Sequence, residues 1–344
     1  MSETWPALGA ATHRPQPCRS RRARLRWWAV GPLLLAAVGC GGDGSSDSND
    51  AITVYTCVSD ETIQPVIKQF ESDHTNTSVN LFRAPTGDLN ARIAGDARSG
   101  GLKADVVWAC DPLTMQGYVD QGLVGGWTPD DAATIPEKFR TDDYVGVALL
   151  YMLAIYHDGV EPPTSWSDLT KPVYGPVALP DPNIAASALG ALGYFDQNPD
   201  YGMAFFEGLK KEGAAQLSTP DDVVNAVAQG TSPAGITIAN SAYASMDAGS
   251  PIGIVWPQPG AVAIYGPVAL AKDSADSTLA KDFISYVISE PGQQLIAKAG
   301  SYPTLPGVTG PELPADAPIV SPDWSTLSAK KDTLLGEYQQ IFGG

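Results

Sequence analysis

The sequence predicts an α/β protein in which two doubly wound lobes are joined by two hinge strands and enclose a ligand cleft. Short apolar runs alternate with segments whose apolar residues recur at helical spacing, which is the pattern of βα units. Two longer apolar runs, at residues 145–156 and 262–271, interrupt this alternation. The chain has 344 residues and 44% of them are apolar, so each lobe can bury a core of its own.

The first part of the chain has a clear βαβαβ rhythm. After a strand expected at 51–56, residues Ile63, Val66, Ile67 and Phe70 fall on one helical face. The pattern predicts helices at 62–72, 89–98 and 113–121 and further strands at 79–82 and 104–108. Consecutive units of this kind form a parallel sheet with right-handed crossovers.

A second series of βα units is expected between the two long apolar runs. The run at 145–156 is interpreted as a strand that leaves the first lobe, and the run at 262–271 as a strand that returns to it. Between them the pattern predicts strands at 177–179, 216–218 and 235–239 and helices at 185–192, 201–211, 221–229 and from about Tyr243. Helices are expected afterwards at 278–299 and 327–342. We therefore assign 51–150 and about 266–344 to lobe 1, and about 151–265 to lobe 2.

The N-terminal segment has the parts of a secretory signal. Five arginines at 19–26 precede an apolar run, Trp27 to Val38, that is shorter than the roughly 20 residues of a bilayer span. The residues that follow, Ala37-Val38-Gly39-Cys40, resemble a bacterial lipobox, which implies cleavage before Cys40 and lipidation of its thiol.

We therefore expect a signal peptide at 1–39 and a lipidated Cys40 that begins a flexible tether at 40–50, rich in Gly, Ser and Asp. The mature protein would be anchored to the outer face of the cell membrane. An ordinary signal peptide and a buried apolar helix are the alternatives, and both Sec and twin-arginine export are open.

Cysteine spacing predicts a disulfide. With Cys18 in the signal and Cys40 lipidated, Cys57 and Cys110 are left in an oxidising compartment. Each follows a short apolar strand at the same offset, so parallel neighbouring strands would bring both thiols to one edge of a sheet. The alternative is a thiolate metal site, but no further Cys or His is nearby in the sequence.

Composition and motifs argue against several classes of function. A net charge of −17 lacks the basic footprint that nucleic-acid binding needs. Beyond residue 39 the sequence has no P-loop, GxGxxG, HExxH or GxSxG motif, and its histidines are His74 and His157. We therefore expect no catalytic residues, no cofactor and no metal. A surface-anchored hydrolase, which would need a nucleophile–base pair, and a structural or adhesion lipoprotein are the competing classes.

An ordered set of segments resembles one protein family. They include ITVYTCVSDETIQPVIKQFE, KADVVWACDPLTMQGYVDQGLV, VGVALLYMLAIY, AGITIANSAY and GAVAIYGPVALAKDS, spread over roughly residues 51–309. Together with the lipobox they resemble the extracellular solute-binding proteins of ABC importers, of the ferric-iron, phosphonate and thiamine-binding kind. The resemblance implies a type II periplasmic-binding-protein fold that closes on a small-molecule solute and docks on an ABC permease, as a monomer held to the membrane through its lipid alone.

Candidate ligand contacts lie where the strands of both predicted sheets end, because open α/β sheets bind ligands at their carboxyl edges. In the first lobe these are Ser59, Asp60, Thr86, Gly87 and Asp111. In the second lobe they are Asn183, Ser187, Asn240, Ser241 and Tyr243, and Tyr151 lies on a hinge strand. Asp181, Ser218, Thr219 and Tyr265 are further candidates. Each has a structural alternative as a helix cap or a core residue.

The resemblance also bears on the solute. Iron-binding members hold ferric ion with adjacent tyrosines, often with a His and a Glu, but the matching positions here are Ala242-Tyr243, Ser59 and Cys110. The hydroxyls, amides and helix N-termini that remain suit an anionic oxygen, and Arg83 would add a charged donor. Asp60 and Asp111 would suit an amine. We therefore expect a phosphonate, phosphate ester or similar zwitterionic or anionic solute, with ferric iron as the alternative.

Overall fold

The computed structural model describes residues 50–343. The expected signal peptide at 1–39, the lipidated Cys40 and the tether up to residue 49 lie outside the described residues. Within 50–343, none of the helices combines the length and the apolarity that a membrane crossing requires.

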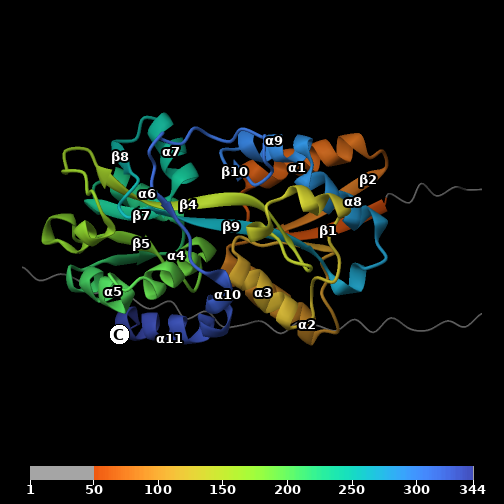
Figure 1. Cartoon of the computed structure of the whole chain (residues 1–344), viewed down its shortest axis with the longest axis horizontal. Helices are drawn as coiled ribbons and strands as arrows, with labels where there is room; N and C mark the ends of the chain where they lie inside the picture. The colour runs from red at the N-terminus through yellow and green to blue at the C-terminus, as the bar shows by residue number, and fades with distance from the viewer. Residues whose placement is uncertain (1–49, 344) are drawn as a thin grey trace, which may run out of the picture. The chain divides into compact units, whose positions relative to one another are not determined.

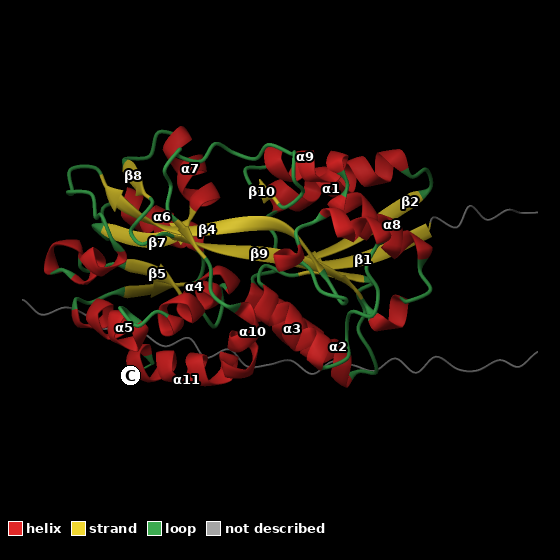
Figure 2. Cartoon of the chain, viewed as in Figure 1, coloured by secondary structure: helices red, strands yellow, loops and turns green. Residues whose placement is uncertain are grey.

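A mixed sheet of eleven strands forms the centre of the described chain, with helices on both of its faces (Figures 1 and 2). Eight strands follow the order β2-β1-β3-β9-β4-β7-β5-β6, while β8 and β10 pair with β4 and β11 pairs with β9. The strands are β1 Asp50–Thr56, β2 Thr77–Arg83, β3 Val106–Trp108, β4 Val145–His157, β5 Ala178–Pro180, β6 Ala215–Leu217, β7 Ala234–Ile238, β8 Ile252–Val255, β9 Ala261–Leu270, β10 Tyr302–Pro303 and β11 Ile319–Val320.

The two ends of the sheet are parallel and its middle is antiparallel. Strand β1 pairs in parallel with β2 and β3, and β5 pairs in parallel with β6 and β7. Between these ends run the two long strands, β4 and β9, paired antiparallel from Val145↔Val268 to Met152↔Val262 with an irregularity between Gly146 and Ala148. They lie side by side through the centre of the sheet in Figure 1. The predicted βα units and the two predicted long strands are thus both present.

The helices follow the apolar periodicity closely. They are α1 Asp60–Asp73, α2 Thr86–Arg98, α3 Pro112–Asp120, α4 Ala186–Gln197, α5 Gly202–Lys211, α6 Pro220–Ala228, α7 Ala239–Asp247, α8 Thr278–Ile288, α9 Glu290–Lys298, α10 Trp324–Leu327 and α11 Lys331–Phe342. Short 3₁₀ helices span Asp130–Thr134, Glu137–Phe139, Trp166–Thr170, Pro172–Tyr174, Lys272–Ser274 and Ser328–Lys330. In α1 the buried face contains the four predicted residues Ile63, Val66, Ile67 and Phe70.

Three helices differ from the sequence-based expectation. The predicted helix at 327–342 is α11 from Lys331 only, since Leu327 ends α10 and Ser328–Lys330 form a 3₁₀ helix. The predicted helix at 278–299 is two helices, because Ser289 has an extended backbone and its Oγ accepts from the N–H of Gly292. Pro291 follows at the start of α9, where its missing N–H costs no hydrogen bond. Helix α7 begins at Ala239, four residues before the expected start at Tyr243.

The C-terminal helix α11 packs on α4 and α5. Its buried residues Leu334, Tyr338 and Phe342 join the same apolar cluster as Phe195 and Phe206. A separate cluster on the other half of the sheet places Phe70 of α1 against Phe283 of α8. The sheet therefore carries distinct cores on its two halves, while the lobe boundaries near residues 150 and 265 stay a prediction.

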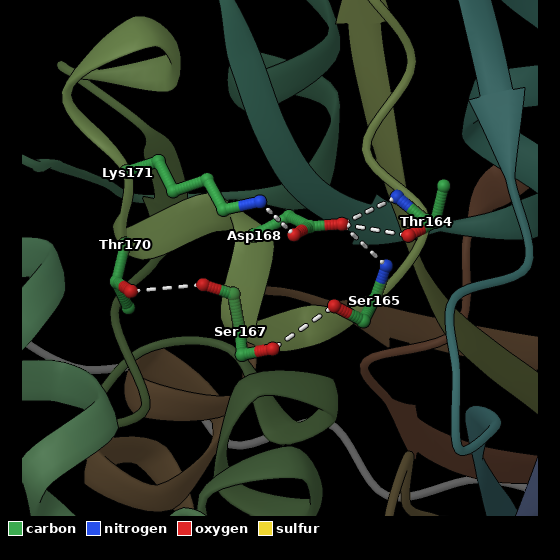
Figure 3. Close-up of polar contacts among 6 residues, drawn as sticks. All are labelled: Thr164, Ser165, Ser167, Asp168, Thr170 and Lys171. Atoms are coloured by element: carbon green, nitrogen blue, oxygen red, sulfur yellow. Dashed lines mark hydrogen bonds and ion pairs between the residues drawn. The ribbon is translucent and has the colours of Figure 1, made fainter.

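The segment after β4 is fixed by a polar cap on the 3₁₀ helix Trp166–Thr170 (Figure 3). The Oδ2 atom of Asp168 accepts from the N–H and the hydroxyl of Thr164, both at 2.8 Å, and from the N–H of Ser165 at 3.1 Å. The Oδ1 atom pairs with Lys171 at 2.5 Å. The Lys171 ammonium and these donors hold the pKa of Asp168 well below its usual range. The cap places Trp166 in the core, where its Nε1 donates to the carbonyl of Gly260 at 2.9 Å.

Candidate functional site

A cavity of about 230 Å³ lies where strands from both halves of the sheet end. Residues at or after the ends of β1, β2 and β3 line one side, which we call the first wall: Cys57, Val58, Ser59, Thr62, Arg83, Pro85, Thr86, Trp108, Ala109 and Cys110. Residues that follow β5, β6 and β7 line the other, the second wall: Ile184 to Ser187, Ser218 to Asp221, Ile238, Asn240 and Ser241. One water occupies about 30 Å³, so the cavity has room for a small organic solute.

The first wall is tied together by the predicted disulfide. Cys57 and Cys110 are bonded, with their Cα atoms 5.9 Å apart. The prediction rested on parallel neighbouring strands, and β1 and β3 do pair in parallel, with Thr56 opposite Trp108. The buried Thr56 hydroxyl donates to the carbonyl of Trp108 at 2.8 Å and accepts from the N–H of Val58 at 3.0 Å. These bonds hold the loops after β1 and β3 in one fixed arrangement.

The second wall is built from the N-termini of α4, α6 and α7. Helix α6 starts with a capping box, in which Thr219 and Asp222 satisfy each other's backbone N–H groups, and it carries Asp221 and Asp222 in its first turn. For α4 and α7, no side chain among residues 50–343 caps the N-terminus, and the first turn of each helix lacks an acidic residue. Unlike α6, these two helices point uncompensated N-terminal dipoles at the cavity.

The two long strands form the floor of the cavity. Ala148 and Leu150 come from β4 and Gly266 from β9, and Ser301, which precedes β10, completes the lining. A Cβ atom at Gly266 would stand 2.9 Å from the carbonyl oxygen of Ala109. Glycine is therefore required here for the close approach of β9 to the end of β3.

Charged side chains are scarce around the cavity. Among the lining residues, all of which are described, the charged ones are Arg83 and Asp221, and both are exposed. The Nε of Arg83 donates to the carbonyl of Val58 at 3.2 Å, so part of its guanidinium is already engaged. Within residues 50–343 no group of three or more His, Cys, Asp or Glu side chains is arranged to hold a metal ion. The lining offers mainly hydroxyls, amides and backbone N–H groups.

Five of the predicted ligand contacts line the cavity together: Ser59, Thr86, Ser187, Asn240 and Ser241. Of the further candidates, Arg83, Ser218 and Thr219 line it as well. These residues come from both walls, so segments that follow the carboxyl ends of strands in both halves of the sheet meet at one cavity. Their contact with a solute stays a prediction.

The other six predicted contacts lie in the described chain but outside the cavity lining. Asp60 starts α1, and Gly87, in α2, donates its N–H to the carbonyl of Ile184. The amide of Asn183 donates to Asp181 at 2.9 Å. Tyr151 packs between the rings of Trp256 and Tyr302, and the hydroxyl of Tyr243 accepts from Nε1 of Trp256 at 3.1 Å.

Asp111, the sixth, is the N-cap of α3. It is fully buried, and its Oδ1 accepts from the N–H of Thr114 at 2.8 Å. Burial raises the pKa of its carboxyl, although the charge of Lys331 and the Thr114 hydrogen bonds oppose the shift. The geometry of Asp111 therefore supports the role of a helix cap, which was the alternative to a ligand contact.

The lining residues that were not predicted contacts include three with buried hydrogen-bonding groups: Thr62, Trp108 and Ser301. Thr62 lies in the first turn of α1 and Trp108 is the last residue of β3, so both are near segments that were predicted to bind. Ser301 follows α9, more than 190 positions beyond Trp108, and nothing local in the sequence indicates that it reaches the cavity.

Comparisons with known proteins agree on one family. The profile of the family described as bacterial extracellular solute-binding protein matches residues 52–301. An uncharacterized protein of Haemophilus influenzae is 25% identical over 290 residues, which is 79% of this chain and 82% of that protein. The spermidine/putrescine-binding periplasmic protein of Escherichia coli is 29% identical over 201 residues, so this chain spans 56% of that relative's length.

Solved structures show the same fold. The periplasmic binding protein AfuA of Actinobacillus pleuropneumoniae, with exogenous fructose-6-phosphate bound, has a TM-score of 0.77 at 18% identity, covering 86% of this chain and 99% of that one. Ferric ion-binding protein A of Pasteurella haemolytica has a TM-score of 0.73 at 20% identity, covering 85% and 98%. The two-lobed fold of periplasmic binding proteins is thus the fold of this chain. The chain belongs to the family of bacterial extracellular solute-binding proteins.

Proposed function

We propose that this protein captures a small anionic or zwitterionic organic solute, such as a phosphate ester or a phosphonate, and delivers it to an ABC permease. The observation that carries the proposal is the pair of uncapped helix N-termini, those of α4 and α7, in the second wall of the cavity. Family membership supports the transport role, and AfuA, which has this fold, binds a phosphate ester.

The geometry of the second wall favours a negative group. The first N–H groups of a helix have no partner within the helix, and the dipole adds partial positive charge at the same end. Ala186 and Ser187 begin α4, while Asn240 and Ser241 stand in the first turn of α7. Backbone N–H groups of this kind bind phosphate and phosphonate oxygens without a neighbouring lysine. Arg83 on the first wall adds a positive charge, and the exposed Asp221 suits the amine of a zwitterion.

Ferric iron is the second candidate because structures of this fold include ferric ion-binding proteins. A hard trivalent cation needs several carboxylate or phenolate oxygens. The Tyr243 hydroxyl accepts a hydrogen bond from Trp256 and lies outside the cavity lining, and Cys110 is in the disulfide.

A polyamine, as in the name of the Escherichia coli relative, needs several acidic groups, and Asp221 is the one carboxylate in the lining. The donor set therefore supports an anion better than either cation.

The anchoring part of the proposal rests on the N-terminal sequence. A lipid on Cys40 and the tether at 40–50 would hold the protein at the outer face of the membrane and raise its effective concentration near the permease. Replacing Cys40 by Ser is expected to move the protein from the membrane fraction into the medium. Retention of C40S in the membrane fraction would contradict the anchor and leave the solute proposal intact.

Solute binding is tested by native mass spectrometry of the freshly purified protein, followed by thermal unfolding with a panel of solutes. The panel holds fructose 6-phosphate, 2-aminoethylphosphonate, methylphosphonate, inorganic phosphate, ferric ion and spermidine. A solute at a hundred times its Kd adds about 2.7 kcal/mol to the free energy of unfolding. Stabilisation by the phosphorus compounds supports the proposal. Stabilisation by ferric ion or spermidine alone would overturn it in favour of a cation.

A further inference from the structure

A polar cluster lies in the first wall and floor of the cavity, apart from the two uncapped helices of the second wall. The Thr62 hydroxyl is 3.4 Å from that of Ser301, and the Ser59 hydroxyl is 3.4 Å from that of Thr62. Thr62 is 2% exposed and Ser301 5% exposed, so both are held inside the protein. Contacts at this distance are at the long limit of a hydrogen bond, which leaves the hydroxyls capacity for a better partner.

Trp108 contributes a further donor to the lining of the same cavity. Its side chain is fully buried, and its indole Nε1 finds no hydrogen-bond partner among the described residues. A Cβ atom at Gly266, which lines the floor, would stand 3.8 Å from this nitrogen. The missing side chain at Gly266 therefore leaves the indole N–H next to the cavity. An indole N–H can only donate, so the group that satisfies it must be an acceptor.

The residues around this cluster disfavour a second negative group of the solute. Helix α1 starts here with Asp60 and Glu61 in its first turn, and these carboxylates already complement its dipole. Arg83, the positive side chain in the lining, donates its Nε to Val58. A neutral oxygen accepts from Trp108 and exchanges hydrogen bonds with Thr62 and Ser301 without facing the repulsion that an anion would meet.

The cluster is also close to the proposed anion site. The loop that carries Ser301 passes beside α7, since a Cβ atom at Gly300 would stand 3.9 Å from Cβ of Asn240. One small molecule can therefore reach both. Taking the proposed anion site as its basis, we infer that Thr62, Trp108 and Ser301 form a second subsite, which binds an uncharged hydroxyl or carbonyl oxygen. The solute is accordingly a hydroxylated organic anion, such as a polyol or sugar phosphate, rather than a bare phosphate or an alkyl phosphonate.

The test compares three ligands and two sets of variants by calorimetric titration. Fructose 6-phosphate presents a phosphoryl group and hydroxyls, whereas inorganic phosphate and methylphosphonate present the anion alone. Wild type is expected to bind fructose 6-phosphate at least tenfold more tightly than the other two. Thr62→Val and Ser301→Ala should each weaken fructose 6-phosphate about tenfold, or about 1.4 kcal/mol, and leave the bare anions within twofold. Trp108→Phe, which removes the indole N–H, should act in the same direction.

Matched controls separate the subsite from general loss of a buried polar group. Thr114→Val alters a threonine that is 1% exposed and outside the cavity lining, and Trp166→Phe removes an indole N–H from another fully buried tryptophan. Both should bind fructose 6-phosphate as wild type does. If Trp108→Phe fails to fold, Thr62→Val and Ser301→Ala decide the question.

The failures of the two proposals are distinct. If wild type binds none of the three phosphorus compounds, the anion site and the subsite that rests on it are both wrong. If wild type binds the bare anions as tightly as fructose 6-phosphate, the second subsite alone is wrong. The same conclusion follows if Thr62→Val and Ser301→Ala weaken all ligands equally or none.

Discussion

Gly87 donates its backbone N–H to the carbonyl oxygen of Ile184 across 3.2 Å, and this bond joins the segment after β2 to the segment after β5. The neighbouring residues Thr86 and Ala185 line the first and second walls, respectively. The two walls are therefore in contact, and the described arrangement is one in which the cavity is closed at this point.

A larger residue at position 87 should prevent that contact. A Cβ atom there would stand 3.3 Å from the carbonyl oxygen of Asn183, so the branched side chain of Gly87→Val would hold the walls apart. We expect at least tenfold weaker binding of whichever solute stabilises wild type, with unfolding of the free protein little changed. Gly95→Val is the matched control, because it is in the same helix and a Cβ atom there meets no described atom within 4 Å. Equal affinity of the two variants would contradict a role for the contact in closure.

The disulfide should be complete in the purified protein and should matter for both stability and binding. A bridge that spans 53 residues stabilises by about 4 kcal/mol on the chain-entropy estimate. Cys57→Ser with Cys110→Ser should therefore lower Tm and also weaken solute binding, because both residues line the cavity. Thiol titration without denaturant should find neither cysteine reactive. Two reactive thiols in the native protein would show that the bridge does not form.

The buried carboxyl of Asp111 should make stability fall as the pH rises. Burial raises its pKa in the folded protein, so between the unfolded value, about 3.9, and the folded value the native state holds the extra proton. Above the folded pKa the carboxylate is charged in the native state, and the full cost of burying this charge lowers the free energy of unfolding. Asp111→Asn keeps an acceptor for the Thr114 N–H and removes the charge. We expect its Tm to exceed that of wild type by about 2–4 °C at pH 8. The difference should shrink toward pH 4, whereas a constant offset would argue against this titration.

Asp168 should show the opposite pH dependence. Its pKa is lowered in the folded protein by Lys171 and by the N–H and hydroxyl donors of the cap, so its contribution is present above the ordinary value and is lost as the pH falls. Asp168→Asn is expected to cost about 1 kcal/mol at pH 7, typical of a lost cap. The gap to wild type should begin to narrow below about pH 4, the unfolded pKa, and should close only as the pH falls through the lower folded pKa. Lys171→Gln should cost less, because the exposed ammonium is screened by water.

The sequence and the structure agree where local pattern decides the outcome. Apolar spacing predicted the buried face of α1, and the offset of Cys57 and Cys110 beyond two strands predicted their bond. In Asp111-Pro112-Leu113-Thr114 the short spacing from Asp to Thr is equally a helix-cap pattern, and the cap is what forms. Spacing alone does not distinguish a ligand contact from a cap.

The remaining differences come from tertiary packing. Thr62 is on α1, Trp108 ends β3 and Ser301 lies in the turn between α9 and β10. The three segments meet only when β10 pairs with β4 and α9 packs on α1. The break at Ser289 does have a local signal, because Ser289 and Pro291 form an N-cap and first-turn pattern, but the apolar spacing that continues across 278–299 concealed it. Tyr243 was expected to face the solute, yet the partner that holds its hydroxyl, Trp256, is on a later segment.

The position of α11 has a consequence for the order in which the protein can fold. Tyr338 and Phe342 fill the core beside Phe206, so apolar surface on α4 and α5 stays uncovered until the last turn of the chain has emerged. A chain that is synthesised from its N-terminus must therefore form α11 before this half can bury its aromatic side chains. Until then the uncovered apolar surface makes the incomplete protein prone to aggregation, which a chaperone that binds apolar surface would prevent.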